Sequence, residues 1–172
     1  WWDPVMAASD ANPYGTAYWN DHGESVTENT RGANSRVIMD RAIPFIQKAT
    51  QARQPFFSII WFHTPHLPVV AGPRFMAMYK DHPKYAQHYY GCITAMDEQV
   101  GRLRSELRKL GAEENTLLFF CSDNGPEGQT GKAPGSAGHL SGRKRSMLEG
   151  GIRVPGLVEW PAHIKPGRTT NI

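Results

Sequence analysis

Two short apolar runs, with a long helical pattern between them, constrain the fold of this chain most strongly. Residues 55–62 (PFFSIIWF) and 116–121 (TLLFFC) are almost uninterrupted apolar segments, as expected of strands covered on both faces. From Tyr89 to Leu110, apolar residues recur at spacings of four and three, and Gly111 stands where a helix C-terminus takes a positive φ. Strand, helix and strand predict a β-α-β unit with a right-handed crossover. The predicted class is therefore α/β, with a mainly parallel central sheet flanked by helices.

Weaker patterns extend this scheme on both sides. Residues 35–49 carry a helical apolar stripe, with Ser35 as a predicted N-cap and Pro44 as a predicted kink. Residues 156–160 predict a third short strand. Residues 1–34 show no sustained periodicity, so they are predicted to be loop-rich with a short hairpin around 21–24.

Size and composition restrict the class of protein. With 172 residues, 40% of them hydrophobic, the chain is long enough for one domain with a core, so we expect a single domain over 1–172. The 19 basic and 16 acidic residues give a net charge of +3, which falls short of a nucleic-acid-binding signature. No run of about 18 apolar residues is present, so no membrane span is predicted.

The two cysteines leave the redox compartment undetermined. Cys92 and Cys121 cannot form a disulfide framework, and each lies in an apolar pattern that predicts a buried thiol. The first four residues, WWDP, resemble neither a signal peptide nor an initiator methionine. The chain is therefore expected to begin within a longer protein.

Polar segments follow both predicted strands, where α/β sheets place their ligands. After Phe62 come two histidines, His63 and His66, in a turn restricted by two prolines. After Cys121 come Asp123 and Asn124, whose oxygens suit a hard cation such as calcium. Taken alone, Asp-Asn-Gly-Pro is as compatible with a reverse turn, and a histidine beside proline with a structural role.

A third segment, 142–155, contains three consecutive cations, Arg143, Lys144 and Arg145, flanked by glycines. Such a loop is either a solvated surface loop or a site for an oxyanion such as sulfate or phosphate. The sequence pattern alone leaves both open.

Taken together and in order, these motifs resemble a known family. The matching segments are 55–57 (PFF), 63–68 (HTPHLP), 122–126 (SDNGP), 142–144 (GRK) and 149–155 (EGGIRVP). In order and spacing they resemble the C-terminal half of the type I sulfatases, which belong to the alkaline-phosphatase-like superfamily. The long helix also fits, through Tyr90-Gly91, Met96-Asp97 and residues 100–103. The resemblance covers about residues 35–167.

The resemblance implies roles for individual residues. It places Asp123 and Asn124 as calcium ligands, Lys144 as a contact of the sulfate and the leaving oxygen, and His66 as the sulfate-contacting histidine. His63 is then expected to be structural. Glu149 and Arg153 are expected to form a structural salt bridge. The roles of His139, Arg143 and Arg145 stay open.

One family feature is absent from this sequence. Sulfatases of this type attack sulfur with a formylglycine made from a C-x-P-x-R motif, and neither Cys92 nor Cys121 lies in such a motif. The resemblance therefore implies a partial alkaline-phosphatase-like sandwich whose N-terminal strands are missing. We expect the chain to be inactive alone and to need the missing N-terminal half, or another chain, to complete its core.

For the complete protein the resemblance implies calcium-dependent hydrolysis of sulfate esters, with a sulfated carbohydrate or an aryl sulfate as substrate. It also implies a periplasmic, extracellular or lysosomal location. The alternatives are a phosphomonoesterase or phosphonate hydrolase of the same superfamily, and a noncatalytic glycan-binding relative. A stand-alone interaction domain fits less well, because too few elements are present to cover the two apolar runs. The N-terminal aromatic residues could line a sugar subsite or contact the core: Trp1, Trp2, Tyr14, Tyr18 and Trp19.

Overall fold

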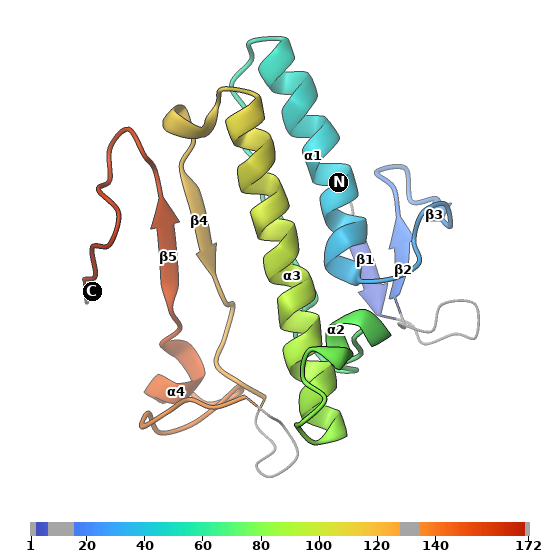
Figure 1. The fold of residues 1–172 in the computed structure, drawn as a ribbon, viewed down its shortest axis with the longest axis vertical. Coiled ribbons are helices and arrows are strands. Elements are labelled where there is room, and N and C mark those ends of the chain that lie inside the picture. Colours follow the sequence, from blue (N-terminus) through green and yellow to red (C-terminus); the bar gives the residue numbers. More distant parts are fainter. Residues whose placement is uncertain (1–2, 7–15, 128–134, 171–172) are drawn as a thin grey trace. The chain divides into compact units, whose positions relative to one another are not determined.

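The computed structural model describes residues 3–6, 16–127 and 135–170 of the chain (Figure 1). It divides into two compact units, residues 1–106 and 107–172, which are described in turn. The prediction that 1–172 form a single domain stays a prediction.

The first unit begins with a small antiparallel sheet. Its strands are β1 (Asp3–Met6), β2 (Thr16–Trp19) and β3 (Ser25–Val26), in the order β1-β2-β3. The turn between β2 and β3 is closed by Asn20, whose N–H donates to the Glu24 carbonyl at 3.0 Å, and Gly23 in this turn has a φ of +75°. A positive φ suits glycine, so the predicted hairpin around 21–24 is confirmed. Of the N-terminal aromatics, Trp1, Trp2 and Tyr14 lie outside the described residues, whereas Tyr18 is buried in the core.

Helix α1 (Asn34–Gln51) confirms the helix predicted from residue 35. Its buried face includes Val37, Ile38 and Ile46, as its apolar stripe requires. The N-cap prediction is wrong: Ala33 occupies that position, and its carbonyl accepts from the N–H groups of Arg36 and Val37. Because the N-cap lies two residues earlier than predicted, Ser35 falls in the first turn of the helix. There its side chain points inward, and its buried hydroxyl has no hydrogen-bond partner among the described residues.

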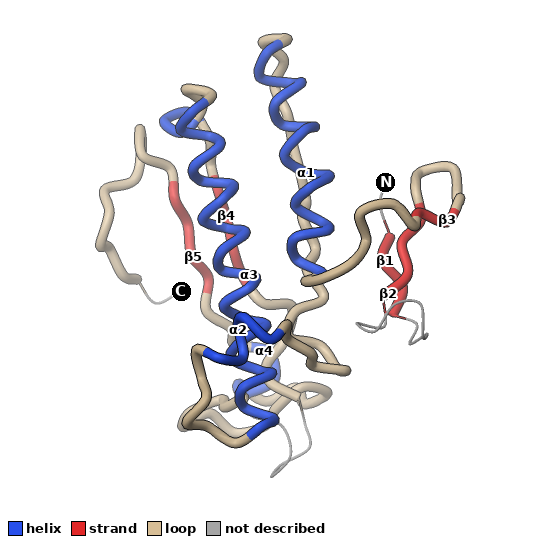
Figure 2. The backbone as a smooth tube through the Cα atoms, turned by 45° about the vertical axis from the view of Figure 1, so that its right-hand side comes forward, coloured by secondary structure: helices blue, strands red, loops and turns tan. Residues whose placement is uncertain are grey.

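Helix α3 (Lys84–Lys109) is the long amphipathic helix, preceded by the short helix α2 (Pro73–Ala77). Helices α1 and α3 lie side by side (Figures 1 and 2). Polar contacts join them: the Gln47 amide donates to the Glu106 carboxylate at 2.6 Å, and Arg102 pairs with Asp40. Burial raises the pKa of the Asp40 carboxyl. Hydrogen bonds from Arg102 and Asn29 and nearby arginine charge outweigh burial, so this pKa lies below its usual value.

The apolar segment 55–62 differs from its prediction. It was expected to be a strand covered on both faces, but it has no assigned strand structure, and no described strand pairs with it. Ile60 and Phe62 pack against the core cluster of β2 and α1. Three other large side chains of the segment are exposed: Phe57, Ile59 and Trp61. From Ile59 to Phe62 burial thus alternates, as it does in a strand covered on one face only. Without a neighbour to exchange ladder hydrogen bonds, the segment does not join a sheet.

The second unit contains a two-stranded sheet. Strand β4 (Leu118–Cys121) pairs antiparallel with β5 (Gly156–Glu159), with Leu118 opposite Glu159 and Cys121 opposite Gly156. A short 3-10 helix (Glu113–Asn115) precedes β4, and α4 (Glu149–Ile152) precedes β5. Gly111 has a φ of +65°, as predicted at the end of the long helix. Both strands confirm their predicted positions. The mainly parallel sheet does not appear, because every strand pair within the described residues is antiparallel.

The two cysteines behave differently. Cys92 is buried as predicted, and burial raises the pKa of its thiol to about 12. Cys121 is exposed, so the prediction of a buried thiol there is wrong. It ends β4 at a position where burial alternates along the strand and the odd-numbered residues face outward.

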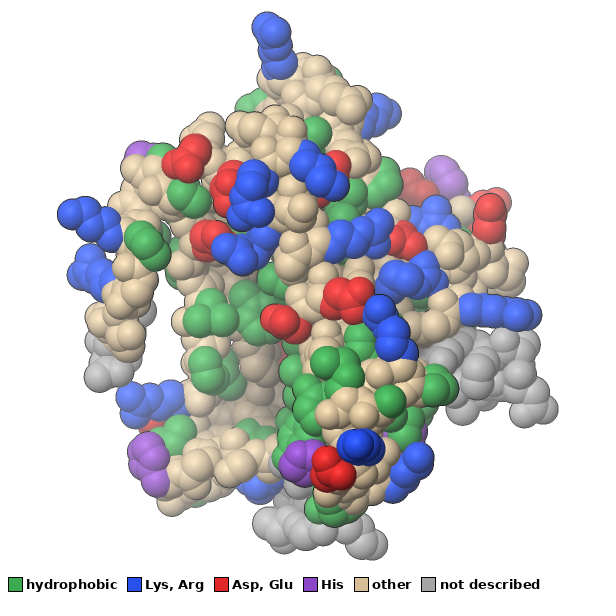
Figure 3. All heavy atoms as spheres, viewed as in Figure 1, with side chains coloured by type: hydrophobic (Ala, Val, Ile, Leu, Met, Phe, Trp, Pro, Cys, Tyr) green, Lys and Arg blue, Asp and Glu red, His purple; other side chains and the backbone are tan. Residues whose placement is uncertain are grey.

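Large apolar side chains are also exposed in the second unit. Phe119 of β4 is 57% exposed and Leu157 of β5 is 65% exposed. Figure 3 shows hydrophobic side chains open to one face of the molecule, where lysines and arginines are interspersed with acidic residues rather than gathered into one basic patch.

Within the described ranges, no helix combines the length and the apolar character needed to cross a membrane.

Two glycines of α3 differ in their surroundings, and we predict opposite effects when each is replaced by alanine. A Cβ at Gly91 would lie 2.9 Å from the Ala71 Cβ and 3.2 Å from the Phe75 backbone. Gly91→Ala should therefore destabilise the protein by about 1–3 kcal/mol through overpacking. At Gly101 a Cβ meets nothing within 4 Å, so Gly101→Ala should stabilise it by about 1 kcal/mol through helix propensity. Urea unfolding of both variants measures this, and equal effects would contradict the packing described here.

Candidate functional site

The predicted histidine turn follows segment 55–62 in the first unit. The His66 N–H donates to the His63 carbonyl at 2.6 Å, which closes the turn, and the Thr64–Pro65 and Leu67–Pro68 peptide bonds are cis. His66 is exposed, and its Nδ1 lies 2.7 Å from the Leu67 carbonyl oxygen. Because a carbonyl only accepts, this contact assigns the proton to Nδ1. In the neutral ring, the Nε2 of His66 is then the acceptor nitrogen.

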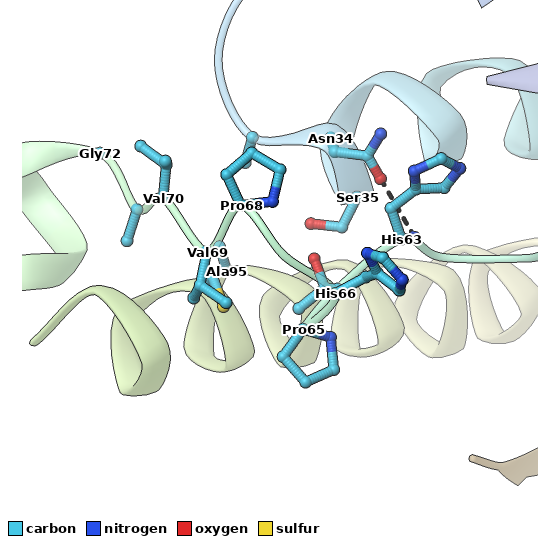
Figure 4. A pocket seen from close by; sticks show the side chains of 14 residues that line it. Asn34, Ser35, His63, Pro65, His66, Pro68, Val69, Val70, Gly72 and Ala95 are labelled. Atoms are coloured by element: carbon cyan, nitrogen blue, oxygen red, sulfur yellow. Dashed lines mark hydrogen bonds between the residues drawn. The ribbon is translucent and has the colours of Figure 1, made fainter. Parts of the chain in front are cut away.

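A pocket lies behind this turn, lined by the first residues of α1, by residues 63–66 and 68–72, and by two residues of α3 (Figure 4). Asn34 crosses it. The Asn34 Oδ1 accepts from the His63 N–H at 3.4 Å, and its Nδ2 donates to the Tyr18 hydroxyl at 2.9 Å. His63 is half-buried, in contrast to His66. The α1 N-terminus therefore links the β2–β3 hairpin to the turn that carries His66.

In the second unit, Asp123 and Asn124 come directly after β4. Asp123 is exposed and Asn124 is half-buried, and neither side chain makes a hydrogen bond or ion pair with the rest of the described chain. The backbone around them is fixed: the Ser122 hydroxyl donates to the Asn124 carbonyl at 2.8 Å, and the Gly125 N–H donates to the Gly151 carbonyl at 2.8 Å. The result is a rigid turn with two oxygen-bearing side chains available to a ligand.

Close backbone packing joins this turn to loop 141–152. A Cβ at Gly125 would lie 1.9 Å from the Gly150 carbonyl oxygen of that loop. The loop is also tightly packed against itself: a Cβ at Gly150 would lie 2.2 Å from the Gly142 carbonyl oxygen, and a Cβ at Gly151 would lie 2.1 Å from the Ser146 carbonyl oxygen. No side chain fits at these positions, so the glycines are required by the contact itself.

The same packing places Lys144 beside the acid-and-amide turn. Its backbone N–H donates to the Pro126 carbonyl at 2.8 Å, and its side chain is half-buried. The neighbouring arginines are held by the protein: Arg143 Nε donates to the Glu127 carbonyl at 2.7 Å, and Arg145 pairs with the Glu127 carboxylate at 2.6 Å. Further along the loop, Glu149 and Arg153 form the expected salt bridge, with 3.3 Å between its charged atoms.

Three of the four predicted site residues, Asp123, Asn124 and Lys144, thus come together in the second unit. His66 belongs to the first unit and is described there. His139 is exposed. Asn34 and Glu127, which hold the two motifs in place, were not singled out from the sequence. Glu127 directly follows the Asp-Asn-Gly-Pro motif, but no sequence signal identifies the arginines that it contacts. Among the described residues, no three His, Cys, Asp or Glu side chains form a group that could hold a metal.

Comparisons with known proteins give a consistent family. The profile of the sulfatase family matches residues 2–172. The chain is 30% identical over 138 residues to N-acetylgalactosamine-6-sulfatase of Rattus norvegicus, covering 80% of this chain. It is 35% identical over 121 residues to arylsulfatase A of Homo sapiens, covering 70% of this chain. The crystal structure of Ps i-CgsB in complex with k-i-k-neocarrahexaose matches 90% of the chain at 34% identity, with a TM-score of 0.79.

The chain spans only part of these proteins. It covers 25% of the rat sulfatase, 23% of human arylsulfatase A and 33% of the crystallised Ps i-CgsB chain.

The glycine contact predicts a sharp difference between two alanine variants of the second unit. Gly125→Ala places a methyl group against the Gly150 carbonyl, so we expect loop 141–152 to separate from the turn. Gly156→Ala is the matched control, because its Cβ would meet only Phe119 at an ordinary 3.5 Å. Limited proteolysis measures the difference: cleavage within 141–152 should accelerate in the first variant only. Equal protection of both variants would contradict this packing.

Proposed function

The chain belongs to the sulfatase family and has its alkaline-phosphatase-like α/β fold, and from this we propose that the protein hydrolyses sulfate esters. One observation carries the proposal to particular residues. The Asp123–Asn124 turn and Lys144 are joined by two backbone hydrogen bonds of 2.8 Å, from Gly125 to Gly151 and from Lys144 to Pro126. Oxygen donors and a cation thus lie on one rigid support.

The chemistry of this arrangement suits sulfate. The Lys144 ammonium is a compact donor of charge-assisted hydrogen bonds to an oxyanion. Asp123 and Asn124 supply a carboxylate and an amide oxygen, which are donors that calcium prefers, and their side chains are not engaged by the described residues. The donor set therefore fits calcium, with Asp123 and Asn124 as two of its ligands. A bound calcium ion would add positive charge beside the sulfate oxygens.

We assign proton donation to the leaving alcohol to His66, with Lys144 as the other candidate. The contact of Nδ1 with the Leu67 carbonyl supports a fixed ring orientation, and in the imidazolium form Nε2 carries the proton that is given to the leaving alcohol. His63 is left with a structural role, supported by its partial burial and by its backbone contact with Asn34.

We propose a sulfated carbohydrate as the substrate class. The support comes from two similar proteins: one is named for N-acetylgalactosamine-6-sulfatase activity, and the other was crystallised with k-i-k-neocarrahexaose. An aryl sulfate is then a convenient assay substrate. By family, we propose a periplasmic, extracellular or lysosomal location.

We further propose that residues 1–172 supply one part of a single catalytic domain. The sequence holds no C-x-P-x-R motif, so no nucleophile is assigned to these residues. Apolar side chains such as Phe57, Trp61 and Leu157 are more than 60% exposed, although their sequence patterns are those of a core. Polypeptide outside these residues, in the same chain or another, would cover them and complete the site.

Replacing the two proposed catalytic side chains in the full-length protein tests the function. His66→Ala and Lys144→Ala should each lower kcat for an aryl sulfate by about 100- to 10,000-fold, the contribution of a positioned proton donor or charge stabiliser. Controls of the same residue types are His22→Ala and Lys165→Ala, which are exposed and lie outside the motifs. Unchanged turnover in both site variants would sink the assignment.

Calcium titration tests whether residues 1–172 supply only part of the calcium site. Residues 1–172 alone should show no micromolar calcium binding by isothermal titration calorimetry, because two ligands fall short of the roughly six to eight oxygens that calcium takes. In the full-length protein, Asp123→Ala should weaken calcium binding. Micromolar affinity in the isolated chain would contradict the proposal.

A further inference from the structure

We propose that Glu127 is a positioning residue for Lys144, and that Arg143 and Arg145 hold the Lys144 loop in place rather than contact the substrate. The proposal rests on the function assigned to Lys144 above. It concerns the two arginines whose roles the sequence left open.

Glu127 contacts the loop on both sides of Lys144. Its backbone carbonyl accepts from Arg143 Nε at 2.7 Å, and its carboxylate pairs with Arg145 Nη1 at 2.6 Å. Arg143 also donates from Nη2 to the Gly135 carbonyl at 2.5 Å. Residue 126, directly before Glu127, accepts the Lys144 N–H. Two consecutive residues of the 122–127 turn therefore fix three consecutive residues of the loop.

The backbone of Arg145 adopts a conformation that needs support from its surroundings. Arg145 has a φ of +73°, in the left-handed region that residues other than glycine rarely adopt. The Glu127 side chain that it meets is 21% exposed, against 70% for Arg145 itself. A partly sheltered carboxylate thus anchors an otherwise exposed guanidinium, which offsets the strain of the turn.

The charges of the loop follow from this arrangement. Arg143 is held by backbone carbonyls and Arg145 by a carboxylate, so their guanidinium groups are engaged by the protein. The Lys144 side chain makes no hydrogen bond or ion pair with the described residues. Of three adjacent cations, Lys144 is then the one presented to an anion, and Glu127 determines where its backbone lies relative to Asp123 and Asn124.

Competitive inhibition by inorganic sulfate tests this in the full-length protein, because it reports on anion binding at Lys144. Glu127→Gln should raise the inhibition constant of sulfate about tenfold, a size typical of coupled neighbours. If Glu127 acts through Lys144, the double variant with Lys144→Ala should be no worse than Lys144→Ala alone. A purely structural role would instead give additive losses, and additive losses would overturn the proposal.

A control and a second variant complete the test. Glu149→Gln breaks the exposed pair with Arg153 in the same loop and should leave the inhibition constant unchanged. Should Glu127→Gln fail to fold, Arg145→Gly removes the same ion pair while relieving the positive φ, and it should reproduce the tenfold rise and the non-additivity. No rise in the folded variant overturns the proposal. An effect of Lys144→Ala without any effect of these variants overturns this inference alone. No effect of Lys144→Ala overturns the role assigned to Lys144 as well.

Discussion

The proposed site depends on the close approach of two backbones at Gly125, where the Gly150 carbonyl oxygen of loop 141–152 occupies the space that a side chain would take. Within that loop, carbonyl oxygens of residues 141–146 leave no room for side chains at Gly150 and Gly151. Backbone hydrogen bonds from Gly125 and Lys144 then fix the register between the two backbones. Because main chains are stiffer than long side chains, this contact locates the oxygen donors and the cation more firmly than an ion pair alone could.

The histidine turn is also held in place by contacts with a second segment, but here a side chain, that of Asn34, makes them. Asn34 stands at the start of α1 and bonds both to Tyr18 of the hairpin and to the backbone of His63. The helix is in turn held against α3 by Asp40 and Arg102. His66 is thus exposed on a turn whose base is tied to buried elements, an arrangement that suits a residue that must meet a ligand in a defined orientation.

Strand pairing explains why two of the predicted strands formed and a third did not. Strands β4 and β5 formed where they were predicted, since their partner lies close in space within one unit. Segment 55–62 has an equally apolar sequence but lacks a described strand beside it. A ladder needs two strands to exchange hydrogen bonds, so local sequence could predict the capacity to form a strand but not its pairing.

The sequence by itself determined the two long helices, the hairpin around 21–24, the positive φ at Gly111 and the family, because periodicity, turn residues and ordered motifs are local or nearly local signals. It also named Asp123, Asn124, Lys144 and His66 as candidates. Only the tertiary structure decided that Ala33 caps α1, that Cys121 is exposed, and that Glu127 engages both arginines beside Lys144. The Glu127 contacts join groups 16 and 18 residues apart in the chain, and such meetings are fixed by packing rather than by neighbouring sequence.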